Sequence, residues 1–574
     1  MSTQFDKPAS RDLNQLLSEL HRHRGAAFAL HTEPAIGHSP EQALPSVPIT
    51  GITYNSKKVE PGDIFVSIEG QKVDGDAYIA EAIEKGARAV VSQKQSGPYS
   101  VPLIVVSDVR AALACLAGSI YDYPSQKLRL LGVTGTNGKT TTTHLIEHIL
   151  GTAGLPVGLI GTLGARMPAA ESGSDSNGKN GDSQTTSRAQ SIIADSDNDP
   201  LLKRLEGDQA KAHYKPGPYI DIKHTTPQAS DLEAMLATMV HHGMSHVAME
   251  VSSHALALKR VFGVHFASAC LTNISQDHLD FHNTMEHYWQ SKRILFEMLG
   301  ESSGKRTAVI NFDDALASKF IEAVPRDVEL ITYGFSSEAN LHVLEKKFDF
   351  SGTRLKLATP SGVIDFTTRL SGNFNLYNVM AAMAVCMGEG LSKEEIAAAL
   401  TDFAGVSGRF EVVPAASAQV SAPLCLVDYA HTPDGLQNVL NTARDLVPVG
   451  GKLVAIFGCG GDRDTSKRPQ MGHIAEDLAD QLVITSDNPR SEDPMLIIND
   501  ILSGLKRLKK VTVEVDRARA IRHTVMAASP QDVVVIAGKG HETYQILKDK
   551  TIDFDDRLEV SKALHERTGG LKGI

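Results

Sequence analysis

Short apolar runs alternate with longer, helix-length stretches along most of this chain. Between Pro48 and Val106 the runs IFVSI and AVVS are separated by PGD and DGD sequences and by one helical stretch, AYIAEAIEKGA. Brief apolar runs bounded by turn residues predict buried strands, and the longer periodic stretch predicts a helix. The pattern therefore predicts a small α/β domain at residues 46–125, preceded by an N-terminal extension at residues 1–45.

The same alternation continues to the end of the chain. From Leu128 the run LRLLGVTG opens a pattern of strand, glycine turn and helix that extends to about Gly408, as expected for a parallel sheet covered by helices. The runs CLVDYA, LVAIFGCG, LVITSD and VVVIAG then alternate with helical segments such as DGLQNVLNTARDL. We therefore predict an α/β fold of three domains, with a mostly parallel central domain at residues 126–408 and a C-terminal, Rossmann-like domain at residues 409–574.

One segment breaks this pattern. From Glu171 to Pro200, 22 of 30 residues are Ser, Gly, Asn, Asp, Thr or Gln. So few apolar residues cannot offset the entropy lost on ordering the segment. We expect residues 166–218 to form a disordered surface insertion in the central domain, and a regulatory or partner-binding loop is the alternative.

Composition narrows the function classes. Of 574 residues, 42% are hydrophobic and 22% charged, which is typical of globular enzymes and excludes a fibrous or wholly disordered chain. The net charge of -11 argues against binding to nucleic acid, so local cations must meet any anionic ligand. Five cysteines without a CxxC pair, no signal peptide and no run of about 18 apolar residues predict a cytoplasmic protein without a membrane span.

The most informative local motif is GTNGKTTTT, Gly135–Thr143, between the apolar run LRLLGV and the helical run HLIEHIL. Backbone N–H groups of such a loop, a helix N-terminus and a lysine can surround a polyphosphate, while a threonine hydroxyl reaches Mg²⁺. Lys139 and Thr140 would take the last two roles. Val133 stands where the general GxxxxGK[ST] pattern has its first glycine, so a glycine-rich turn that only begins a helix is the alternative.

Two other segments place metal-ligand chemistry at the ends of predicted strands. MEVSSHAL brings Glu250 to the end of one strand, and LTNISQDHLDFH follows another with Asn273, Asp277, His278, Asp280 and His282. An α/β sheet presents its ligands at the carboxyl ends of its strands. Because Mg²⁺ prefers oxygen, each histidine taken singly fits an ordinary loop or capping residue at least as well.

Together these segments resemble the Mur ligase family, the ATP-dependent amino-acid-adding enzymes of peptidoglycan synthesis. GTNGKT, EVSSHAL, TNISQDHLD, YWQSK, SGNFNLYN, GRFE and DYAHTPDGL occur in the family's order, and the resemblance extends from about Gly51 to the C-terminus. The shortened phosphate loop is the family's own form. The resemblance implies that residues 46–125 bind the UDP end of the substrate, residues 126–408 bind ATP, and residues 409–574 bind the incoming amino acid.

Within this family the chain is most similar to the ligases that add meso-2,6-diaminopimelate to the D-glutamate of UDP-N-acetylmuramoyl-L-alanyl-D-glutamate. The resemblance implies Mg²⁺ as cofactor, ATP as co-substrate and an acyl-phosphate intermediate that the incoming amine attacks. Such charge-rich steps call for positioned cations rather than for an enzyme nucleophile. We further expect a monomer that binds no nucleic acid.

The resemblance also assigns residues around ATP. The implied ATP-binding residues are Gly135, Thr136, Asn137, Gly138, Lys139, Thr140, Thr141, Asn375, Asn378, Arg409, Asp428 and His431. The implied catalytic residues are Lys139, Glu250, His278 and Lys292, and the implied metal ligands are Thr140, Glu250, His278 and Lys292. Lys292 would act as a carbamate, whose anionic oxygen suits magnesium. A solvated helix lysine is the alternative for Lys292, and helix N-caps are the alternative for Asn375 and Asn378.

Two further sets complete the implied site. The UDP-muramoyl-dipeptide set is Ser56, Thr225, Thr226, Ser252, Ser253, Arg260 and Lys292, and Lys57 stands where the family has arginine. The diaminopimelate set is Arg463, Asp487, Asn488, Pro489, Arg490, Gly538 and Glu542. Diaminopimelate differs from lysine by a distal carboxylate, which the Arg490 fork would pair with and which lysine lacks. Glu542 would receive the ammonium group of the amino acid.

Three other readings remain open. The same ligation could use L-lysine, or the chain could be a nucleotide-binding module without catalysis. Folylpolyglutamate synthase is a structural relative of the family, but it has no reason to carry the N-terminal domain or the DNPR sequence at residues 487–490.

Overall fold

The computed structural model describes residues 8–24, 30–33, 46–70, 74–168, 214, 216–222, 224–349, 352–414, 422–506 and 511–567. Most of the insertion expected at residues 166–218, and much of the extension at residues 1–45, lies outside these residues. The chain forms two compact units. The first contains Met1–Gly132, Glu147–Ser268 and Glu301–Arg306, and the second contains Val133–Ile146, Ala269–Gly300 and Thr307–Ile574.

The first sheet lies within the first unit and has the strand order β2-β7-β6-β5-β4. Its strands are β2 (Leu30–Glu33), β4 (Gly51–Thr53), β5 (Asp63–Val66), β6 (Ala89–Ser92) and β7 (Leu103–Val106), all parallel to their neighbours except β2. α1 (Leu13–Arg24) and α3 (Val109–Ile120) share one hydrophobic core with this sheet, and α2 (Ile79–Glu84) contributes to a second. β1 (Arg11–Asp12) and β3 (Pro48–Ile49) form a separate short antiparallel pair, and β3 lies between β2 and β4 in the chain.

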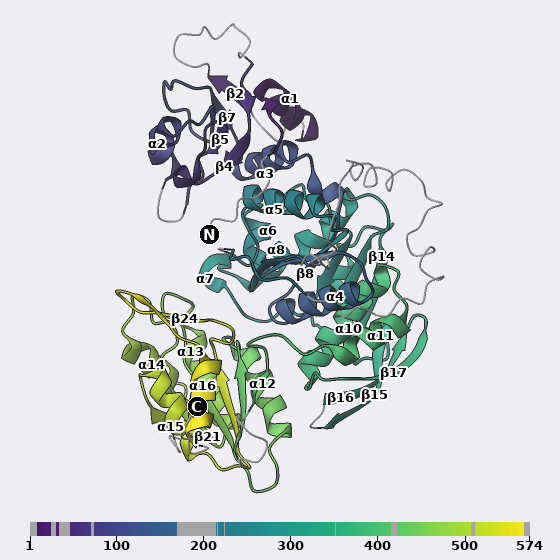
Figure 1. The fold of residues 1–574 in the computed structure, drawn as a ribbon, viewed down its shortest axis with the longest axis vertical. Coiled ribbons are helices and arrows are strands. Elements are labelled where there is room, and N and C mark those ends of the chain that lie inside the picture. The colour runs from purple at the N-terminus through teal and green to yellow at the C-terminus, as the bar shows by residue number, and fades with distance from the viewer. Residues whose placement is uncertain are drawn as a thin grey trace, which may run out of the picture. The chain divides into compact units, whose positions relative to one another are not determined.

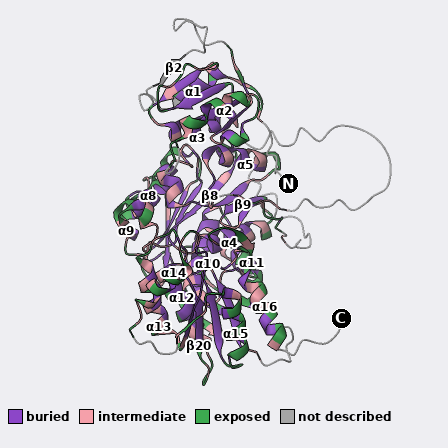
Figure 2. Ribbon diagram, turned by 90° about the vertical axis from the view of Figure 1, so that its left-hand side faces the viewer, coloured by how far each residue is buried: buried purple, intermediate pink, exposed green. Residues whose placement is uncertain are grey.

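The largest sheet has the order β10-β9-β11-β8-β12-β13-β14-β15-β16-β17. Its strands are β8 (Arg129–Thr134), β9 (Val157–Gly161), β10 (Gly164–Arg166), β11 (His246–Glu250), β12 (Ser268–Leu271), β13 (Thr307–Asn311), β14 (Glu329–Gly334), β15 (Leu341–Asp349), β16 (Gly352–Thr359) and β17 (Gly362–Thr368). Figure 2 shows β8 and β9 as buried, and β11, β12 and β13 are buried too, as expected for a sheet covered on both faces, whereas β15, β16 and β17 carry exposed residues.

Both edges of this sheet differ from the parallel pattern expected from the sequence, and at one of them β10 runs antiparallel to β9. β15, β16 and β17 pair antiparallel, and each is separated from the next by only two residues. So short a connection can join only antiparallel strands, because a parallel pair needs a crossover of a dozen residues or more. The hairpin between β16 and β17 turns at Gly362, whose φ of +108° favours glycine.

Helices connect and cover these strands. They are α4 (Lys139–Thr152), α5 (Ala229–His241), α6 (Ser253–Ala257), α7 (Leu279–His282), α8 (Met285–Glu297), α9 (Ala317–Ile321), α10 (Asn373–Gly388) and α11 (Lys393–Asp402). α4 begins directly after the glycine loop that follows β8, as the sequence predicts. Within the described residues, no helix combines the length and the apolar character needed to cross a membrane.

The third sheet belongs to the second unit and has the order β18-β19-β23-β20-β21-β22. Its strands are β18 (Glu411–Val413), β19 (Leu424–Asp428), β20 (Leu453–Phe457), β21 (Gln481–Ile484), β22 (Val511–Val513) and β23 (Val533–Ala537), and only β18 runs antiparallel to its neighbour. Helices lie on both of its faces (Figure 1), and a hairpin of β24 (Tyr544–Ile546) and β25 (Thr551–Asp553) follows β23. This parallel α/β arrangement confirms the expected fold class.

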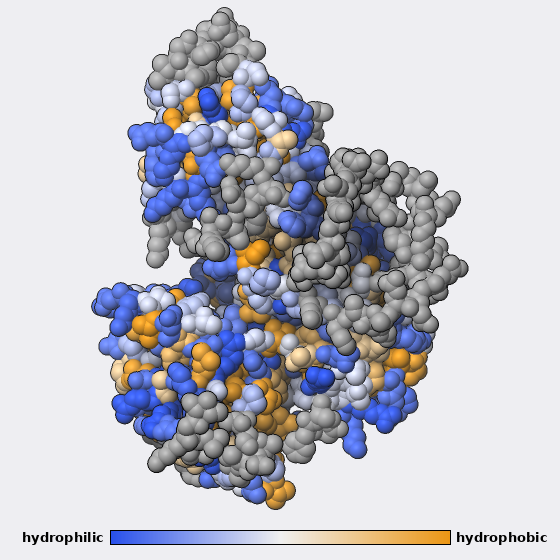
Figure 3. Space-filling model, viewed as in Figure 1, coloured by the Kyte–Doolittle hydropathy of each residue, from blue (hydrophilic) through white to orange (hydrophobic). Residues whose placement is uncertain are grey.

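Two hydrophobic cores fill the two faces of this third sheet. One contains residues of α12 (Pro433–Asp445), α13 (Lys467–Leu478) and α14 (Pro494–Leu502), and the other contains residues of α15 (Arg517–Ala527) and α16 (Asp556–Arg567). The outer surface mixes hydrophobic and hydrophilic side chains in small groups (Figure 3). Arg517 and Asp556 form a fully buried ion pair that joins α15 to α16, with Nε to Oδ1 and Nη2 to Oδ2 distances of 2.7 Å each.

Candidate active site

The glycine loop between β8 and α4 is packed so closely that its glycines cannot be replaced. Gly135 has a φ of +144°, and a Cβ atom there would lie 1.9 Å from Thr272 Oγ1. Gly138 has a φ of +87°, and a Cβ atom would lie 2.3 Å from Asn378 Oδ1. Thr272 Oγ1 also donates to Asn137 O over 2.6 Å. The loop is therefore held in one conformation by the end of β12 and by α10.

Two lysines converge on one carbonyl group of this loop. Lys139 Nζ donates to Gly135 O over 2.9 Å and to Thr136 O over 2.8 Å. Lys292 Nζ, from α8, donates to the same Gly135 O over 2.7 Å. The two lysines thus bring two basic side chains to the backbone N–H groups of this loop, and a basic site of this kind on a net acidic chain suits a polyphosphate.

Lys292 is a buried residue. Its exposed fraction is 1%, and its Nζ lies 4.6 Å from the centre of the Tyr288 ring. Burial, and then the charge of Lys139, hold the pKa of Lys292 well below its usual value. The alternative of a solvated helix lysine is therefore wrong, and the side chain lies buried against the phosphate loop, where its charged form is disfavoured.

Asp277 and His278 lie beside these lysines. His278 has a φ of +54°, and its Nε2 lies 3.4 Å from Asp277 Oδ2. Burial disfavours the Asp277 carboxylate, but His278, His431 and nearby lysines outweigh it and lower the pKa of Asp277 to about 2. Loss of solvent, reinforced by Lys292 and Lys139, lowers the pKa of His278 to about 4. At neutral pH this pair is therefore an anionic carboxylate with a neutral imidazole.

Arg409 and Asp434, which are far from the loop in the sequence, also contact it within the second unit. Arg409 Nη2 donates to Thr140 Oγ1 over 3.1 Å, and Asn137 Nδ2 donates to Asp434 Oδ2 over 2.7 Å. The Arg409 guanidinium lies 4.5 Å from the centre of the Tyr429 ring, and its buried Nε has no partner among the described residues. Thr140 and Thr141 are both buried in the first turn of α4.

Asn375 and Asn378 share one face of α10, as their spacing predicts. Asn378 Nδ2 donates to Asn375 Oδ1 over 3.3 Å, and Asn375 Nδ2 donates to Ser371 O over 3.0 Å. The N-cap of α10 is Gly372. The alternative of asparagine N-caps is therefore wrong, and both amides lie buried beside the phosphate loop, where Asn378 Oδ1 accepts from Thr142 Oγ1 over 3.4 Å.

Asp428 ends β19 and His431 follows it, but the two residues have different partners. The two Asp428 oxygens accept from Phe410 N and Ala430 N, each over 2.7 Å. Burial raises the pKa of Asp428, although Arg409 opposes that shift. Burial, reinforced by Lys467, lowers the pKa of His431 to about 4. Asp428 thus fixes the backbone on which Phe410 and Ala430 lie, whereas His431 remains neutral near Asp277.

In the first unit, Glu250 is the centre of a polar cluster at the end of β11. Its exposed fraction is 0%, and its oxygens accept from Thr162 N over 2.8 Å and Thr162 Oγ1 over 3.0 Å. Thr162 Oγ1 lies 3.2 Å from Thr225 Oγ1. A Cβ atom at Gly161 would lie 2.4 Å from Glu250 Oε1. The carboxylate is therefore locked in place by the β9–β10 connection, and each oxygen retains a lone pair for a further ligand.

Thr226, Ser252 and Arg260 extend this cluster. Thr226 Oγ1 donates to Glu250 O over 2.9 Å, and Ser252 N donates to Thr226 Oγ1 over 3.0 Å. Ser252 caps α6, in which Ser253 is the first, buried residue. Arg260 Nη1 donates to Thr226 O over 3.0 Å, while its buried Nε has no partner among the described residues. The guanidinium thus keeps a donor for a further acceptor.

Ser56 lies elsewhere in the first unit. Its Oγ donates to Glu81 Oε2 over 3.0 Å, and its carbonyl oxygen accepts from Lys85 Nζ over 3.1 Å. Lys57, where an arginine was expected from the family, is exposed. No hydrogen bond within the described residues joins Ser56 to Thr225, Thr226 or Ser252.

Arg463 and Arg490 form a second positive site, in the C-terminal domain. Arg490 has a φ of +53°, and its Nη1 donates to Gly461 O over 2.7 Å. Arg463 Nη1 donates to Asp462 O over 3.0 Å. Burial, and then Arg463, lower the pKa of Arg490. Among the described residues neither guanidinium forms an ion pair, so two cations lie close together without a carboxylate on either.

Asn488 and Glu542 lie beside this arginine pair. Asn488 Nδ2 donates to Glu542 Oε2 over 2.8 Å, and Asn488 N donates to Asp487 Oδ1 over 2.6 Å. Burial raises the pKa of Glu542. A Cβ atom at Gly538 would lie 2.5 Å from Asp487 Oδ2, and Pro489 O accepts from Glu492 N over 3.1 Å. The seven residues assigned to diaminopimelate therefore lie on adjoining loops after β20, β21 and β23.

Sequence reasoning missed three residues that support these sites. Lys539 has an exposed fraction of 0%, and its Nζ donates to Glu542 Oε2 over 2.7 Å and to Asn488 Oδ1 over 3.2 Å. Arg468 is also buried and bonds Glu492 and Asp500, and Thr162 holds Glu250. Lys539 stands inside the GKGHE sequence, so its place between Gly538 and Glu542 was a usable signal. Nothing around Thr162 or Arg468 distinguishes them locally.

Comparison with known proteins adds three sequence-family matches. Residues 48–121 match "Mur ligase family, catalytic domain", residues 133–386 match "Mur ligase middle domain", and residues 408–540 match "Mur ligase, glutamate ligase domain". The matched residues include the phosphate loop, the Lys292 region and the arginine pair.

Individual relatives extend over nearly the whole chain. A Gloeobacter violaceus protein named "UDP-N-acetylmuramoyl-L-alanyl-D-glutamate--2,6-diaminopimelate ligase" is 43% identical over 543 residues, which cover 94% of this chain and 99% of the relative. A Thermosynechococcus vestitus protein of the same name is 41% identical over 540 residues, covering 94% and 97%. A solved structure described by that name has 30% identity and a TM-score of 0.59, covering 91% of this chain and 96% of the other.

Proposed function

The chain belongs to the Mur ligase family, and we propose that it uses ATP to join meso-2,6-diaminopimelate to the D-glutamate of UDP-N-acetylmuramoyl-L-alanyl-D-glutamate in peptidoglycan precursor synthesis. The observation that carries this assignment is the arginine pair, Arg463 and Arg490, which has no carboxylate partner among the described residues. A second carboxylate on the amino acid would pair with it. Lysine brings no such group and leaves the charge of the half-buried Arg490 uncompensated.

We assign the activation of the D-glutamate carboxylate to the phosphate loop. A carboxylate is a poor electrophile, so its oxygen first attacks the γ-phosphorus of ATP and ADP leaves. Lys139 already lies over the loop and would exchange its carbonyl contacts for phosphate oxygens. The diaminopimelate amine then attacks the acyl carbon, phosphate leaves and the amine loses a proton. Both steps build charge that fixed cations stabilise.

We assign Asn375, Asn378, Arg409 and His431 to the nucleotide. The two amides supply donors and acceptors beside the loop, and Arg409 adds a cation next to Thr140. Asp428 acts one step away, because both its oxygens are taken by backbone N–H groups. Exclusion of water by these residues would protect the acyl phosphate from hydrolysis.

We assign a carbamate to Lys292. Carbamate forms when a neutral amine nitrogen bonds to the carbon of CO₂ and releases a proton, so the lowered pKa of Lys292 favours the reactive form. The product replaces a donor beside Gly135 O with anionic oxygens. Such oxygens suit a magnesium site, whereas an ammonium group would repel the metal.

The donor chemistry of Thr140, Glu250, His278 and carbamylated Lys292 fits Mg²⁺. A hydroxyl and a buried carboxylate are hard oxygen ligands, and the low pKa of His278 keeps its imidazole in the neutral form that binds metals. Mg²⁺ held by these residues would offset the negative charge of the phosphate groups. Thr162 orients Glu250 for that role.

We assign the UDP-muramoyl-dipeptide to Ser56, Thr225, Thr226, Ser252, Ser253 and Arg260, with Lys292 at the reacting end. The unpartnered Nε of Arg260 offers a donor to an anionic group of this substrate. We place the domain boundaries at residues 46–125, 126–408 and 409–574, in line with the three sheets and the three family matches. We expect a cytoplasmic protein that is active as a monomer.

One assay tests the assignment. The full chain is incubated with UDP-N-acetylmuramoyl-L-alanyl-D-glutamate, ATP, Mg²⁺ and either meso-diaminopimelate or L-lysine, and phosphate release and product mass are measured. We expect the diaminopimelate adduct, with lysine used at least about 100-fold less efficiently because it leaves Arg490 unpaired. Efficient use of lysine alone would overturn the specificity, and absence of phosphate release with every substrate would support the non-catalytic alternative.

A further inference from the structure

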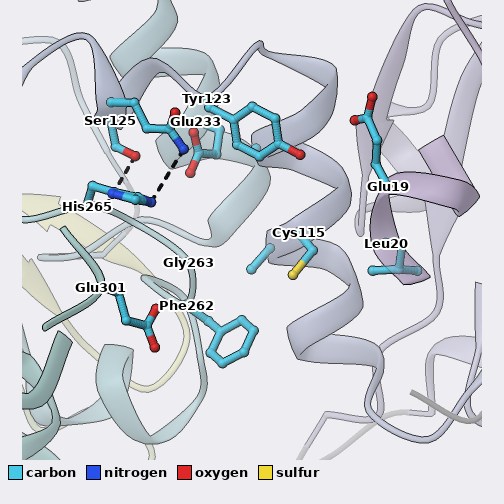
Figure 4. A pocket seen from close by; sticks show the side chains of 13 residues that line it. Glu19, Leu20, Cys115, Tyr123, Ser125, Glu233, Phe262, Gly263, His265 and Glu301 are labelled. Carbon is cyan, nitrogen blue, oxygen red and sulfur yellow. Dashed lines mark hydrogen bonds between the residues drawn. The ribbon is translucent and has the colours of Figure 1, made fainter. Parts of the chain in front are cut away.

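A cavity of about 450 Å³ lies in the first unit, among elements that the proposed reaction does not use. Its walls come from α1, α3, α5, the segment around Tyr123, the loop around Phe262 and from Glu301 (Figure 4). This volume lies within the range of small-molecule sites in proteins. Every residue that lines it belongs to the same unit.

The charge of the cavity is one-sided. Glu19, Glu233 and Glu301 line it together with His265, and no lysine or arginine is among its described lining residues. Glu19 is occupied, since it accepts from Arg11 and Ser119 at one wall. Phe262 and Tyr123 add two aromatic rings. A cavity with acidic and aromatic walls complements an organic cation.

Glu233 supplies the second, independent observation. Its exposed fraction is 4%, and its buried Oε2 has no hydrogen-bond partner in the described part of the chain. Figure 4 shows its carboxyl group at the cavity, near the Tyr123 ring and Ser125. An unpartnered buried carboxyl group costs stability, so a ligand that bonds it would supply what the fold leaves unmet. Burial raises the pKa of Glu233 to about 8, so an ammonium group that binds here would favour the ionised carboxylate and displace its proton.

We propose that this cavity binds a small organic amine, whose ammonium group pairs with Glu233 and whose apolar part lies against Tyr123 and Phe262. A single metal ion fits less well. A metal site needs several ligand atoms close together. In the described residues, His473, Glu476 and Asp477 of the second unit are the group of three His, Cys, Asp or Glu side chains whose ligand atoms lie within 4.8 Å of one another, and the cavity glutamates form no such group. An elongated cation can instead reach Glu233 while filling the rest of the cavity.

Cys115 makes occupancy measurable without any ligase assay. It lines the cavity and is half-buried, whereas the other four cysteines are buried. Benzylamine is the probe, benzyl alcohol is its uncharged counterpart, and the rate of Cys115 alkylation by N-ethylmaleimide in the full chain is followed by mass spectrometry. We expect benzylamine to slow the alkylation saturably and benzyl alcohol to do so at least about tenfold less effectively, because one charge-assisted hydrogen bond corresponds to at least that factor.

Variants locate the effect at Glu233. Both E233L and E233Q are expected to bind benzylamine about tenfold or more weakly, and E233Q keeps the side-chain shape if E233L fails to fold. E84Q is the matched control, because Glu84 is exposed on α2 outside the cavity, and its binding should equal that of the unaltered chain. Equal binding of benzylamine by E233Q, equal protection by benzyl alcohol, or no protection of Cys115 in the unaltered chain would overturn the proposal.

A second pair of probes separates simple amines from amino acids. Cadaverine carries the amine groups without a carboxylate, whereas the carboxylate of L-lysine would meet Glu19 and Glu301. We expect cadaverine to protect Cys115 at lower concentration than L-lysine does. The reverse order would show that the cavity selects amino acids and would overturn the assignment to simple amines. Since every readout is binding, loss of ligase activity in these variants has no bearing on the result.

Discussion

Replacement of Arg490 by alanine should separate the two chemical steps. The Arg490 side chain has only backbone carbonyl partners in the described structure, so a diaminopimelate carboxylate would form its principal pair. A forked pair contains two charge-assisted hydrogen bonds of about 1.5–3 kcal/mol each, or about 3–6 kcal/mol together. At 1.4 kcal/mol per factor of ten, kcat/KM for diaminopimelate should fall about 10²- to 10⁴-fold.

The folded state should tolerate this change. Arg463 repels Arg490, and alanine at a φ of +53° meets no more strain than arginine does. The backbone bond from Arg490 N to Ile546 O remains. We therefore expect the melting temperature to stay constant or to rise slightly, which would distinguish a lost ligand contact from a damaged fold.

Two assays report the two steps. Steady-state phosphate release with varied diaminopimelate gives kcat/KM, and positional isotope exchange in labelled ATP, with the UDP-muramoyl-dipeptide but without diaminopimelate, reports formation of the acyl phosphate. R490A should have a much lower kcat/KM for diaminopimelate but should retain the isotope exchange in ATP. R354A is the control, because Arg354 of β16 pairs with Asp365 of β17 on an exposed part of the largest sheet. Equal loss of both activities in R490A, or a change in kcat/KM of less than about tenfold, would refute the reasoning.

A subtler variant moves the guanidinium without removing its charge. A Cβ atom at Gly460 would lie 2.9 Å from Arg490 Nη1, so G460A must displace the end of this side chain. We expect G460A to lower kcat/KM for diaminopimelate by less than R490A does and to leave isotope exchange intact. The same assays measure it.

Three other predictions concern different groups. K292Q should lower ligase activity at least about 100-fold, and the unaltered chain should lose activity in CO₂-depleted buffer and regain it with bicarbonate; an active K292Q would contradict the carbamate. D556A should lower the free energy of unfolding in urea by about 3–5 kcal/mol, because it leaves the Arg517 charge buried alone, and a loss below about 1 kcal/mol would contradict this. The melting temperature should fall as the pH is lowered from 6.5 to about 4. Burial lowers the pKa of His431 to about 4 in the folded chain, so the unfolded chain binds the proton at higher pH and is favoured as the pH falls. The melting temperature of H431Q should depend less steeply on pH, and the same dependence in H431Q as in the unaltered chain would contradict this.

The sequence predicted those parts of the site whose chemistry is local. The phosphate loop, the strand that precedes it and the helix that follows it lie within about two dozen residues, so spacing alone placed Lys139 and Thr140 correctly at the start of α4. The three-residue spacing of Asn375 and Asn378 likewise predicted their shared face. These inferences needed only turn chemistry and helical periodicity.

Other features depend on contacts between distant residues, and local patterns carry no trace of them. The bond between Asn137 and Asp434 joins residues 297 positions apart. Glu233 lies in an amphipathic helix where a glutamate is ordinarily solvated, and only the packing of α3 against α5 buries it. Likewise, the sequence around Lys292 does not predict its burial, because it has the pattern of an ordinary amphipathic helix. Only the structure shows that Lys292 Nζ donates to Gly135 O.

The ion pair between Arg517 and Asp556 also affects the steady-state amount of this protein in the cell. α16 supplies the only carboxylate that pairs with the buried Arg517 guanidinium in the described structure, and Arg567 at its end bonds three backbone carbonyls, those of Val525, Met526 and Ala528. A chain truncated before Asp556 would lose both attachments and spend more time unfolded, where proteases act. Substitutions in this last helix should therefore lower the amount of enzyme in the cell while leaving the turnover of each surviving molecule unchanged.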